Sequence, residues 1–175
     1  MPDGLFPVVV VTPEQILLGA EARAVVLRSS DGDLTVLDGH TPLVTDVVPG
    51  EVRIDQEGGA VRLAVHGGYL QVEKGAVGAG AGSGEERSSS GTRVTLLAGV
   101  AELADQIDVA RAERARSEAA AKIEERRAAG GVAGGAASEE GAPGASSGED
   151  RELAEAQAAL RRAEVRLAVA GVTTP

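Results

Sequence analysis

The chain has 175 residues, no cysteine, one Phe, one Tyr, no Trp and a formal net charge of −10. The lack of cysteine excludes disulfides, thiolate metal sites and cysteine nucleophiles, and an acidic chain without a basic stripe is a poor candidate for binding nucleic acid. The apolar run at residues 5–11 is too short for a secretion signal, and no segment approaches the length of a membrane span. We therefore expect a soluble protein that associates with a membrane only through a partner.

The first 77 residues predict a series of short β-strands. The alternation is clearest where Val61, Leu63 and Val65 are interleaved with other residues, which is typical of a strand with one buried face. An Asp-Gly pair at 38–39 and a Pro-Gly pair at 49–50 separate such runs, because glycine supplies positive φ and proline fixes φ. Many short strands with turns between them favour an antiparallel sandwich or barrel over a parallel α/β sheet.

Residues 78–91 interrupt this pattern with alternating glycines followed by charged residues and serines. Alternating glycines also occur in nucleotide-binding loops, but such a loop follows a strand and opens a helix. This segment instead leads into another strand-like run at residues 92–98. We therefore expect a flexible, solvated hairpin insert.

The apolar period changes in the C-terminal part of the chain. Residues 101–128 contain neither proline nor glycine and are rich in Ala, Glu and Arg, so they predict one helix. Leu103, Ile107 and Ala110 would begin its apolar stripe, which continues mostly as alanine and has Ile123 near its end. Residues 129–150 are acidic and of low complexity, and they predict a disordered linker.

Residues 151–170 predict a second helix. Its apolar residues step by three and four without a break and form a heptad-like seam of Leu153, Ala156, Leu160, Ala163, Leu167 and Ala170. Because seams of Leu and Ala bury little apolar area, we expect the two helices to form a hairpin of marginal stability. The long linker would also make opening of the hairpin entropically cheap.

These patterns together predict a fold of two parts. Residues 1–98 are expected to form an antiparallel β-sandwich of about ten short strands that carries the insert at 78–91. Residues 99–175 are expected to form a C-terminal α-helical hairpin of helix 101–128, linker 129–150 and helix 151–170.

Three motifs carry a resemblance to a known family. They are Asp-Gly-His-Thr-Pro-Leu at 38–43, Val-His-Gly-Gly-Tyr-Leu-Gln-Val at 65–72 and Gln-Ile-Asp-Val-Ala-Arg-Ala at 106–112. In this order and spacing, over residues 5–77 and 92–127, the chain resembles the epsilon subunit of the bacterial F-type ATP synthase. Asp38 stands where that family has a proline.

The resemblance implies a non-catalytic rotor subunit of the F1 sector. Its β domain would bind the gamma subunit and the c-ring and couple proton flow to ATP synthesis. Its hairpin would switch to an extended state that contacts the alpha/beta catalytic ring and inhibits ATP hydrolysis. The subunit would lie at the cytoplasmic face of the bacterial cell membrane, as a peripheral protein.

The resemblance also implies a regulatory ATP site, because residues 107–112 match the family pattern Ile/Leu-Asp-x-x-Arg-Ala. A carboxylate can accept a hydrogen bond from an adenine amino group, and arginines can hold phosphate. The alternative is an ordinary surface ion pair between Asp108 and Arg111, and Glu118 stands where some ATP-binding members carry an arginine. The candidate site consists of Glu102, Asp108, Arg111, Ala112, Arg162 and Arg166.

The same resemblance assigns the loops at 29–33 and 38–42 to the face presented to the c-ring. The candidate partner-facing residues are Ser30, Asp31, Asp33, Asp38, His40 and Pro42. The alternative for the three aspartates is turn chemistry, which favours Asp in any case. The basic residues of the hairpin are interleaved with acids, which is typical of a solvated face and also suits contact with acidic surfaces on the catalytic ring.

No combination of nucleophile, general base and oxyanion site is evident in the sequence. The two histidines, His40 and His66, have no partner at the spacing of a catalytic triad or metal site, so we expect neither catalysis nor a metal cofactor. ATP, as a regulatory ligand, would be the only cofactor. The alternative function is a stand-alone binding module, a β-sandwich with a coiled-coil hairpin, unrelated to ATP synthase.

Overall fold

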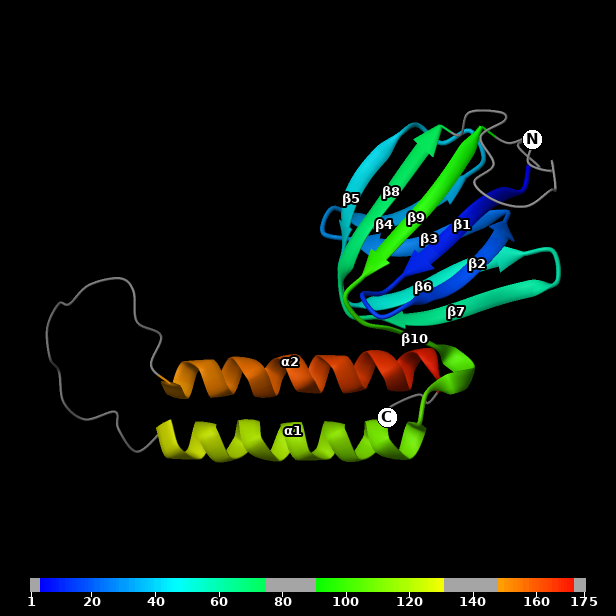
Figure 1. Ribbon diagram of the computed structural model, residues 1–175. Helices are drawn as coiled ribbons and strands as arrows, with labels where there is room; N and C mark the ends of the chain where they lie inside the picture. The colour runs from blue at the N-terminus through cyan, green and yellow to red at the C-terminus, as the bar shows by residue number, and fades with distance from the viewer. Residues whose placement is uncertain (1–3, 75–90, 131–147, 172–175) are drawn as a thin grey trace, which may run out of the picture. The chain divides into compact units, whose positions relative to one another are not determined.

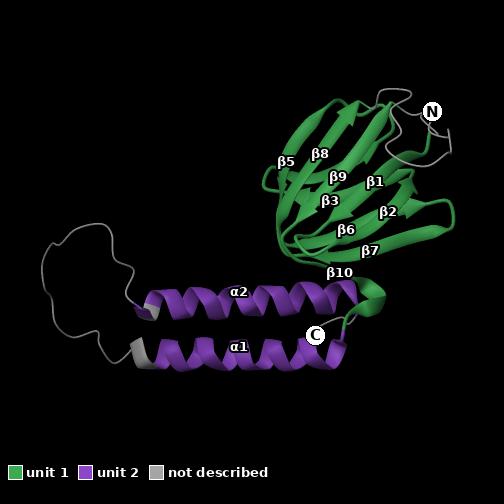
Figure 2. Ribbon diagram, viewed as in Figure 1, with its two compact units in different colours: residues 1–107 green, residues 108–175 purple. Residues whose placement is uncertain are grey.

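The computed structural model describes residues 4–74, 91–130 and 148–171, and the chain divides into two compact units (Figure 1). Unit 1 is Met1–Ile107 and unit 2 is Asp108–Pro175, as Figure 2 shows. Unit 1 contains all of the strands of the described residues, and unit 2 contains the two long helices.

Unit 1 is a sandwich of two five-stranded sheets. The first sheet has the order β2-β1-β9-β8-β5 and consists of β1 (Phe6–Val11), β2 (Ile16–Ala22), β5 (Leu43–Val47), β8 (Gly68–Lys74) and β9 (Thr92–Ala98). The second has the order β10-β7-β6-β3-β4 and consists of β3 (Ala24–Ser29), β4 (Gly32–Leu37), β6 (Gly50–Gln56), β7 (Gly59–Val65) and β10 (Ala101–Leu103). The prediction of a sandwich of about ten short strands is confirmed for the described part of the chain.

Neighbouring strands pair antiparallel, as predicted, with one exception. β1 pairs parallel with β9, with Val8 opposite Val94 and Val10 opposite Leu96. On their other edges, β1 pairs antiparallel with β2 and β9 pairs antiparallel with β8.

The core lies between the two sheets and is built from alternating strand residues. Phe6, Val8 and Val10 of β1 are buried, and so are the inward residues of the facing strands, such as Ile54 and Leu63. Val, Leu, Ile and Ala supply nearly the whole core, as the scarcity of aromatic residues requires. Each such side chain contributes about 1.5–3 kcal/mol on full burial, so the sandwich has a stability of its own.

The first helix starts later than the sequence predicts. Residues 101–107 do not begin a helix: they form β10 and a 3-10 turn, η1 (Ala104–Gln106), and α1 runs over Val109–Gly130. The unit boundary accordingly follows Ile107 and not residue 98. The physical reason is tertiary, because Ala101 and Leu103 pack against the sandwich core and outweigh the helical propensity of the segment.

The predicted stripe of alanines with Ile123 near its end is confirmed, but its start is one register off at Ala110. Ala110 is exposed, whereas the buried residues of the helix are Ala112, Ala119 and Ile123. Val109 is half-buried and continues the same spacing of three and four residues towards the N-terminus of the helix.

The predicted seam of the second helix, α2 (Gly148–Val169), is confirmed. Ala156, Ala163 and Leu167 are buried, and the other seam residues are half-buried. α1 and α2 pack against each other, and an ion pair between Arg126 and Glu152 joins their ends. Both helices reach into the predicted linker, whose remaining residues 131–147 lie outside the described residues, as do residues 78–90 of the predicted insert.

Candidate functional site

The two turns predicted to face one partner lie at opposite ends of a single strand. Ser29 and Gly32 close the β3–β4 hairpin, whereas Asp38 follows the last residue of β4. Six strand residues at about 3.3 Å each separate the two turns by about 20 Å. The two turns therefore present separate surfaces, and the assignment of both to the c-ring stays a prediction.

The β3–β4 turn is held by short polar contacts. The Ser30 hydroxyl donates to Asp46 Oδ1 over 2.8 Å, and the buried Ser29 hydroxyl donates to the Gly32 carbonyl over 3.2 Å. The hydrogen bond from Ser30 holds the pKa of Asp46 below its ordinary value of 3.8. Asp31 is exposed and Asp33 forms only a long ion pair with Arg28, so this end of the sandwich presents three carboxylates.

The turn after β4 is rigid for a different reason. The Gly39 amide donates to Asp38 Oδ1 over 2.9 Å and to the buried Thr92 hydroxyl over 2.7 Å, and Gly39 has a φ of 81°. His40 Nδ1 lies 2.7 Å from the Thr41 carbonyl oxygen, and the His40 amide donates to the Leu37 carbonyl. Asp38 and His40 are thus half-buried turn residues, and Pro42 beside them is exposed.

The outer face of the first sheet carries two adjacent rows of uncharged residues, which sequence reasoning missed. Its charged residues lie at the margins of these rows, with Asp46 opposite Tyr69 and with Glu21, Glu73 and Arg93 beyond the second row. Its strand register places one apolar or aromatic residue beside the next across four strands, in the row Ile16, Val11, Leu97 and Tyr69. The row beside it consists of Gly19, Val9, Thr95, Gln71 and Val44. The unbroken valine run at 8–11 was the available signal, because a strand that is polar on one face interrupts such a run.

Several of these side chains are both large and exposed. Ile16 and Val44 expose 69% of their surface, Tyr69 61% and Leu97 45%. A monomer seldom leaves a contiguous apolar surface of this kind uncovered unless it binds something. We call these two rows the uncharged face.

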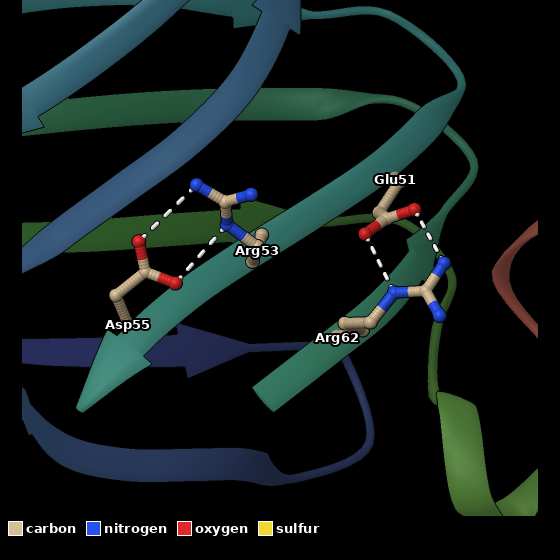
Figure 3. A network of polar contacts seen from close by, with 4 residues as sticks. All are labelled: Glu51, Arg53, Asp55 and Arg62. Atoms are coloured by element: carbon tan, nitrogen blue, oxygen red, sulfur yellow. Dashed lines mark hydrogen bonds and ion pairs between the residues drawn. The ribbon is translucent and has the colours of Figure 1, made fainter. Parts of the chain in front are cut away.

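The outer face of the second sheet has the opposite character (Figure 3). Arg53 and Arg62 lie directly opposite each other on β6 and β7, which would be unfavourable without compensation. Arg62 donates two hydrogen bonds to Glu51, of 2.7 and 2.8 Å, and Arg53 pairs with Asp55 at 3.0 Å. The hydrogen bond from Arg62 holds the pKa of Glu51 below its ordinary value of 4.5. This face is polar, and its charges neutralise one another.

The six residues of the predicted ATP site are divided between the two units. Glu102 lies on β10 in unit 1, and the other five belong to unit 2. Arg111 and Arg162 are exposed, and neither forms an ion pair with the described part of the chain. Arg166 is half-buried on α2.

The sequence pattern suggested that Asp108 lies within the helix, but in the structure Asp108 is the N-cap residue of α1. The Arg111 amide donates to Asp108 Oδ1 over 2.9 Å, and the Ala112 amide donates to the Asp108 carbonyl over 3.0 Å. The surface ion pair between the Asp108 and Arg111 side chains is absent from the described contacts. Ala112, one turn further on, is buried.

Unit 2 also contains a groove between its two helices, of about 490 Å³. Alanines form its floor and charged side chains its rim; the lining residues are Ala115, Glu118, Ala119, Lys122, Glu125, Arg126, Glu152, Glu155, Ala156 and Ala159. None of the predicted ATP-site residues lines it. Within residues 4–74, 91–130 and 148–171, His, Asp and Glu form no cluster suited to a metal ion, and no helix is long and apolar enough to cross a membrane.

Comparison with known proteins identifies the family. Residues 5–82 match the family model of the ATP synthase delta/epsilon chain, β-sandwich domain. The chain is 36% identical to the ATP synthase epsilon chain of Symbiobacterium thermophilum over 163 residues, 93% of this chain and 90% of that one. It is 37% identical to the ATP synthase epsilon chain of Desulforudis audaxviator over 123 residues, 70% of this chain and 77% of that one. The chain belongs to the ATP synthase epsilon family.

Membership of the epsilon family rejects the alternative of a binding module unrelated to ATP synthase. The fold agrees with it: a chain in the cryo-EM structure of the Euglena gracilis mitochondrial ATP synthase, with OSCP, F1 and c-ring, superposes with a TM-score of 0.64. That match covers 96% of this chain and 82% of the other at 19% identity, and at this identity it bears on the fold alone.

Proposed function

We propose that the chain is a non-catalytic rotor subunit that couples proton translocation to ATP synthesis, and that the uncharged face is where it binds the gamma subunit. The observation that carries the proposal is the contrast between the two sheets. One outer face is lined by exposed Ile16, Val44, Tyr69 and Leu97, and the other by mutually paired charges. A rotor must transmit torque without slipping, and a rigid sheet with an apolar surface provides a broad, dehydrated contact for that purpose.

Two exposed leucines on opposite faces provide a matched test. Leu97 lies on the uncharged face and is 45% exposed, and Leu37 lies on β4 of the second sheet and is 42% exposed. Covering the exposed part of a leucine contributes about 1 kcal/mol, so Leu97→Ser should weaken binding to purified gamma about fivefold. Leu37→Ser should leave the affinity unchanged. Equal effects of the two variants would exclude the uncharged face as the gamma site.

We propose that the c-ring contacts the β3–β4 turn, through Ser30, Asp31 and Asp33. The support is the cluster of carboxylates at one end of the sandwich, which is suited to the polar loops of a partner. Asp31→Asn with Asp33→Asn should reduce retention of the chain on a detergent-solubilised c-ring. Asp38→Asn with His40→Gln, at the other end of β4, is the control. If only the control substitutions Asp38→Asn and His40→Gln reduced retention on the c-ring, the contact would be reassigned to Asp38, His40 and Pro42.

We propose further that unit 2 inhibits ATP hydrolysis by extending against the alpha/beta catalytic ring. The support is its thin Ala- and Leu-based seam, together with exposed Arg161 and Arg162 on α2. A chain that ends at Ile107 keeps β10, which packs on the core of unit 1, and is the appropriate truncation. Reconstituted F1 carrying this form should hydrolyse ATP faster than F1 with the full chain. Unchanged hydrolysis with the subunit still bound would leave only the coupling role.

Regulatory ATP binding at Glu102, Asp108, Arg111, Ala112, Arg162 and Arg166 is a separate proposal. Its support is the motif at 107–112 and the two arginines, Arg111 and Arg162, that lack an ion pair in the described residues.

The complex would place the chain at the cytoplasmic face of the bacterial membrane, through its partners. Membrane fractionation of the native complex, with and without the c-ring, tests that location.

A further inference from the structure

Residues 101–107 adopt a structure that their own sequence does not favour. Ala101, Glu102, Leu103, Ala104 and Gln106 are among the strongest helix formers, yet three of them form β10 and the others a 3-10 turn. A segment whose local preference contradicts its fold depends on tertiary contacts to stay in place.

The tertiary contacts described for this segment come mainly from one short strand pairing. β10 is an edge strand of three residues, with Ala101 opposite Val65, Glu102 opposite Ala64 and Leu103 opposite Leu63. Ala101 and Leu103 are half-buried against the core, and Ile107 at the end of the segment is buried. The backbone is extended at Leu103, with φ −69° and ψ 142°, and again at Ile107, with φ −71° and ψ 120°, so helical geometry is broken on both sides of η1.

The break nearest to α1 is maintained by Asp108. Its carboxylate accepts from the Arg111 amide and its carbonyl from the Ala112 amide, the hydrogen bonds of an N-cap residue. An N-cap residue has non-helical backbone angles, so this cap and a helix that passes through Asp108 exclude each other.

We infer that residues 101–107 are a switch segment: the Asp108 cap and the β10–β7 pairing hold it as strand and 3-10 turn, and their release lets it join α1 as helix. Seven added residues at about 1.5 Å each would lengthen α1 by about 10 Å at its N-terminus. Asp108 is thus a positioning residue that sets where unit 2 begins. The inference concerns the conformation of this chain alone and stands or falls independently of its partners and of ATP.

Three variants of the full chain test the switch in nucleotide-free buffer. Asp108→Ala removes the cap and also raises helix propensity, whereas Asp108→Ser retains a capping hydroxyl. Ala104→Pro suits the strand form, because Leu103 already has the extended angles that precede proline and proline is accepted at the first position of a helical turn. The Ala104→Pro substitution disfavours a helix that passes through Leu103, because the residue before a proline avoids the helical backbone region.

Amide hydrogen exchange of the β10 peptide is the measurement, with β9 as internal reference. Loss of a cap changes an opening equilibrium about fivefold or more, so Asp108→Ala should accelerate exchange in β10 by that factor. Asp108→Ser should exchange as the unmodified chain does, and Ala104→Pro combined with Asp108→Ala should restore slow exchange. Carbon chemical shifts of residues 101–107 should move towards helical values in Asp108→Ala.

Acceleration restricted to the first turn of α1, with β10 unchanged, would mean that the cap stabilises α1 only, and the inference would be overturned. It would equally be overturned if β10 and β9 exchanged faster together, because that pattern indicates loosening of the whole sandwich. Chemical shifts that moved towards coil would also exclude a helical alternative.

Discussion

Gly68 is the residue at which the sandwich tolerates least additional volume. It opens β8 and pairs with Val47 of β5 on one side and Ala98 of β9 on the other. A Cβ atom at this position would lie 2.1 Å from the Leu97 carbonyl oxygen and 3.0 Å from the Ala98 Cα. Both obstacles are backbone atoms at the end of the β8–β9 ladder, so no side-chain rotation relieves the contact. Gly68→Ala therefore requires β9 to move away from β8.

The expected cost can be worked from this geometry. The approach to the Leu97 carbonyl is about 1.3 Å shorter than an ordinary contact of 3.4 Å. Overpacking of this kind costs about 1–3 kcal/mol, and a weakened ladder hydrogen bond adds about 0.5–1.5 kcal/mol. We expect the free energy of unfolding of unit 1 to fall by about 2–4 kcal/mol. For a domain of this size the midpoint temperature should fall on the order of 10–25 °C.

Thermal and urea unfolding of the full chain, followed by circular dichroism of the β-sheet signal, measures this loss. Gly19→Ala is the matched control, because Gly19 lies in β2 without positive φ, and a Cβ atom there would have nothing within 4 Å. Gly19→Ala should leave the free energy of unfolding unchanged or raise it by up to about 1 kcal/mol. Gly67→Ala, where φ is 103° and space is adequate, isolates backbone strain at about 1–3 kcal/mol. Equal midpoints for Gly68→Ala and Gly19→Ala would refute the steric argument.

Further predictions concern charge, the hairpin and the ligand. Because Arg62 lowers the pKa of Glu51, this carboxylate stabilises the fold above its ordinary pKa of 4.5 and loses that effect as the pH falls through its lowered folded value. Glu51→Gln should therefore flatten the acid limb of the stability–pH curve, measured by urea unfolding from pH 7 to pH 3, and an unchanged limb would contradict the pairing. Leu167 is fully buried in α2, so Leu167→Ala should lower the free energy of unfolding of the helical pair by about 2–5 kcal/mol, and the helical signal should be lost before the β-sheet signal. Ala168→Ser, at an exposed neighbouring position, should leave both transitions unchanged. Isothermal titration with millimolar ATP and Mg²⁺ should show binding that Arg111→Ala abolishes; absence of heat with the unmodified chain would eliminate the ATP site.

The relation between the sequence and these findings differs from one element to the next. The seam of α2 follows from neighbours three or four residues apart and was predictable, whereas the alternation expected for β7 fails at Ala64, which is as fully buried as Leu63 and Val65. The turn at 38–43, one of the three motifs that carry the resemblance to the family, was also predictable, because a turn with Gly39 at positive φ depends on local chemistry. The candidate ATP residues rest on motif likeness, and the role of Asp108 as a cap became visible only when the start of α1 was known.

Length, composition and period-two or period-3.6 patterns thus determined that this chain is a β-sandwich with a helical pair. Only the tertiary structure decided that β1 runs parallel to β9, that β10 is a strand, and that two rows of uncharged residues lie side by side on the outer face of one sheet. The physical reason is distance along the chain. Val8 meets Val94, and Leu103 meets Leu63, and pairings between residues so far apart are chosen by the packing of the whole core, which no local pattern encodes.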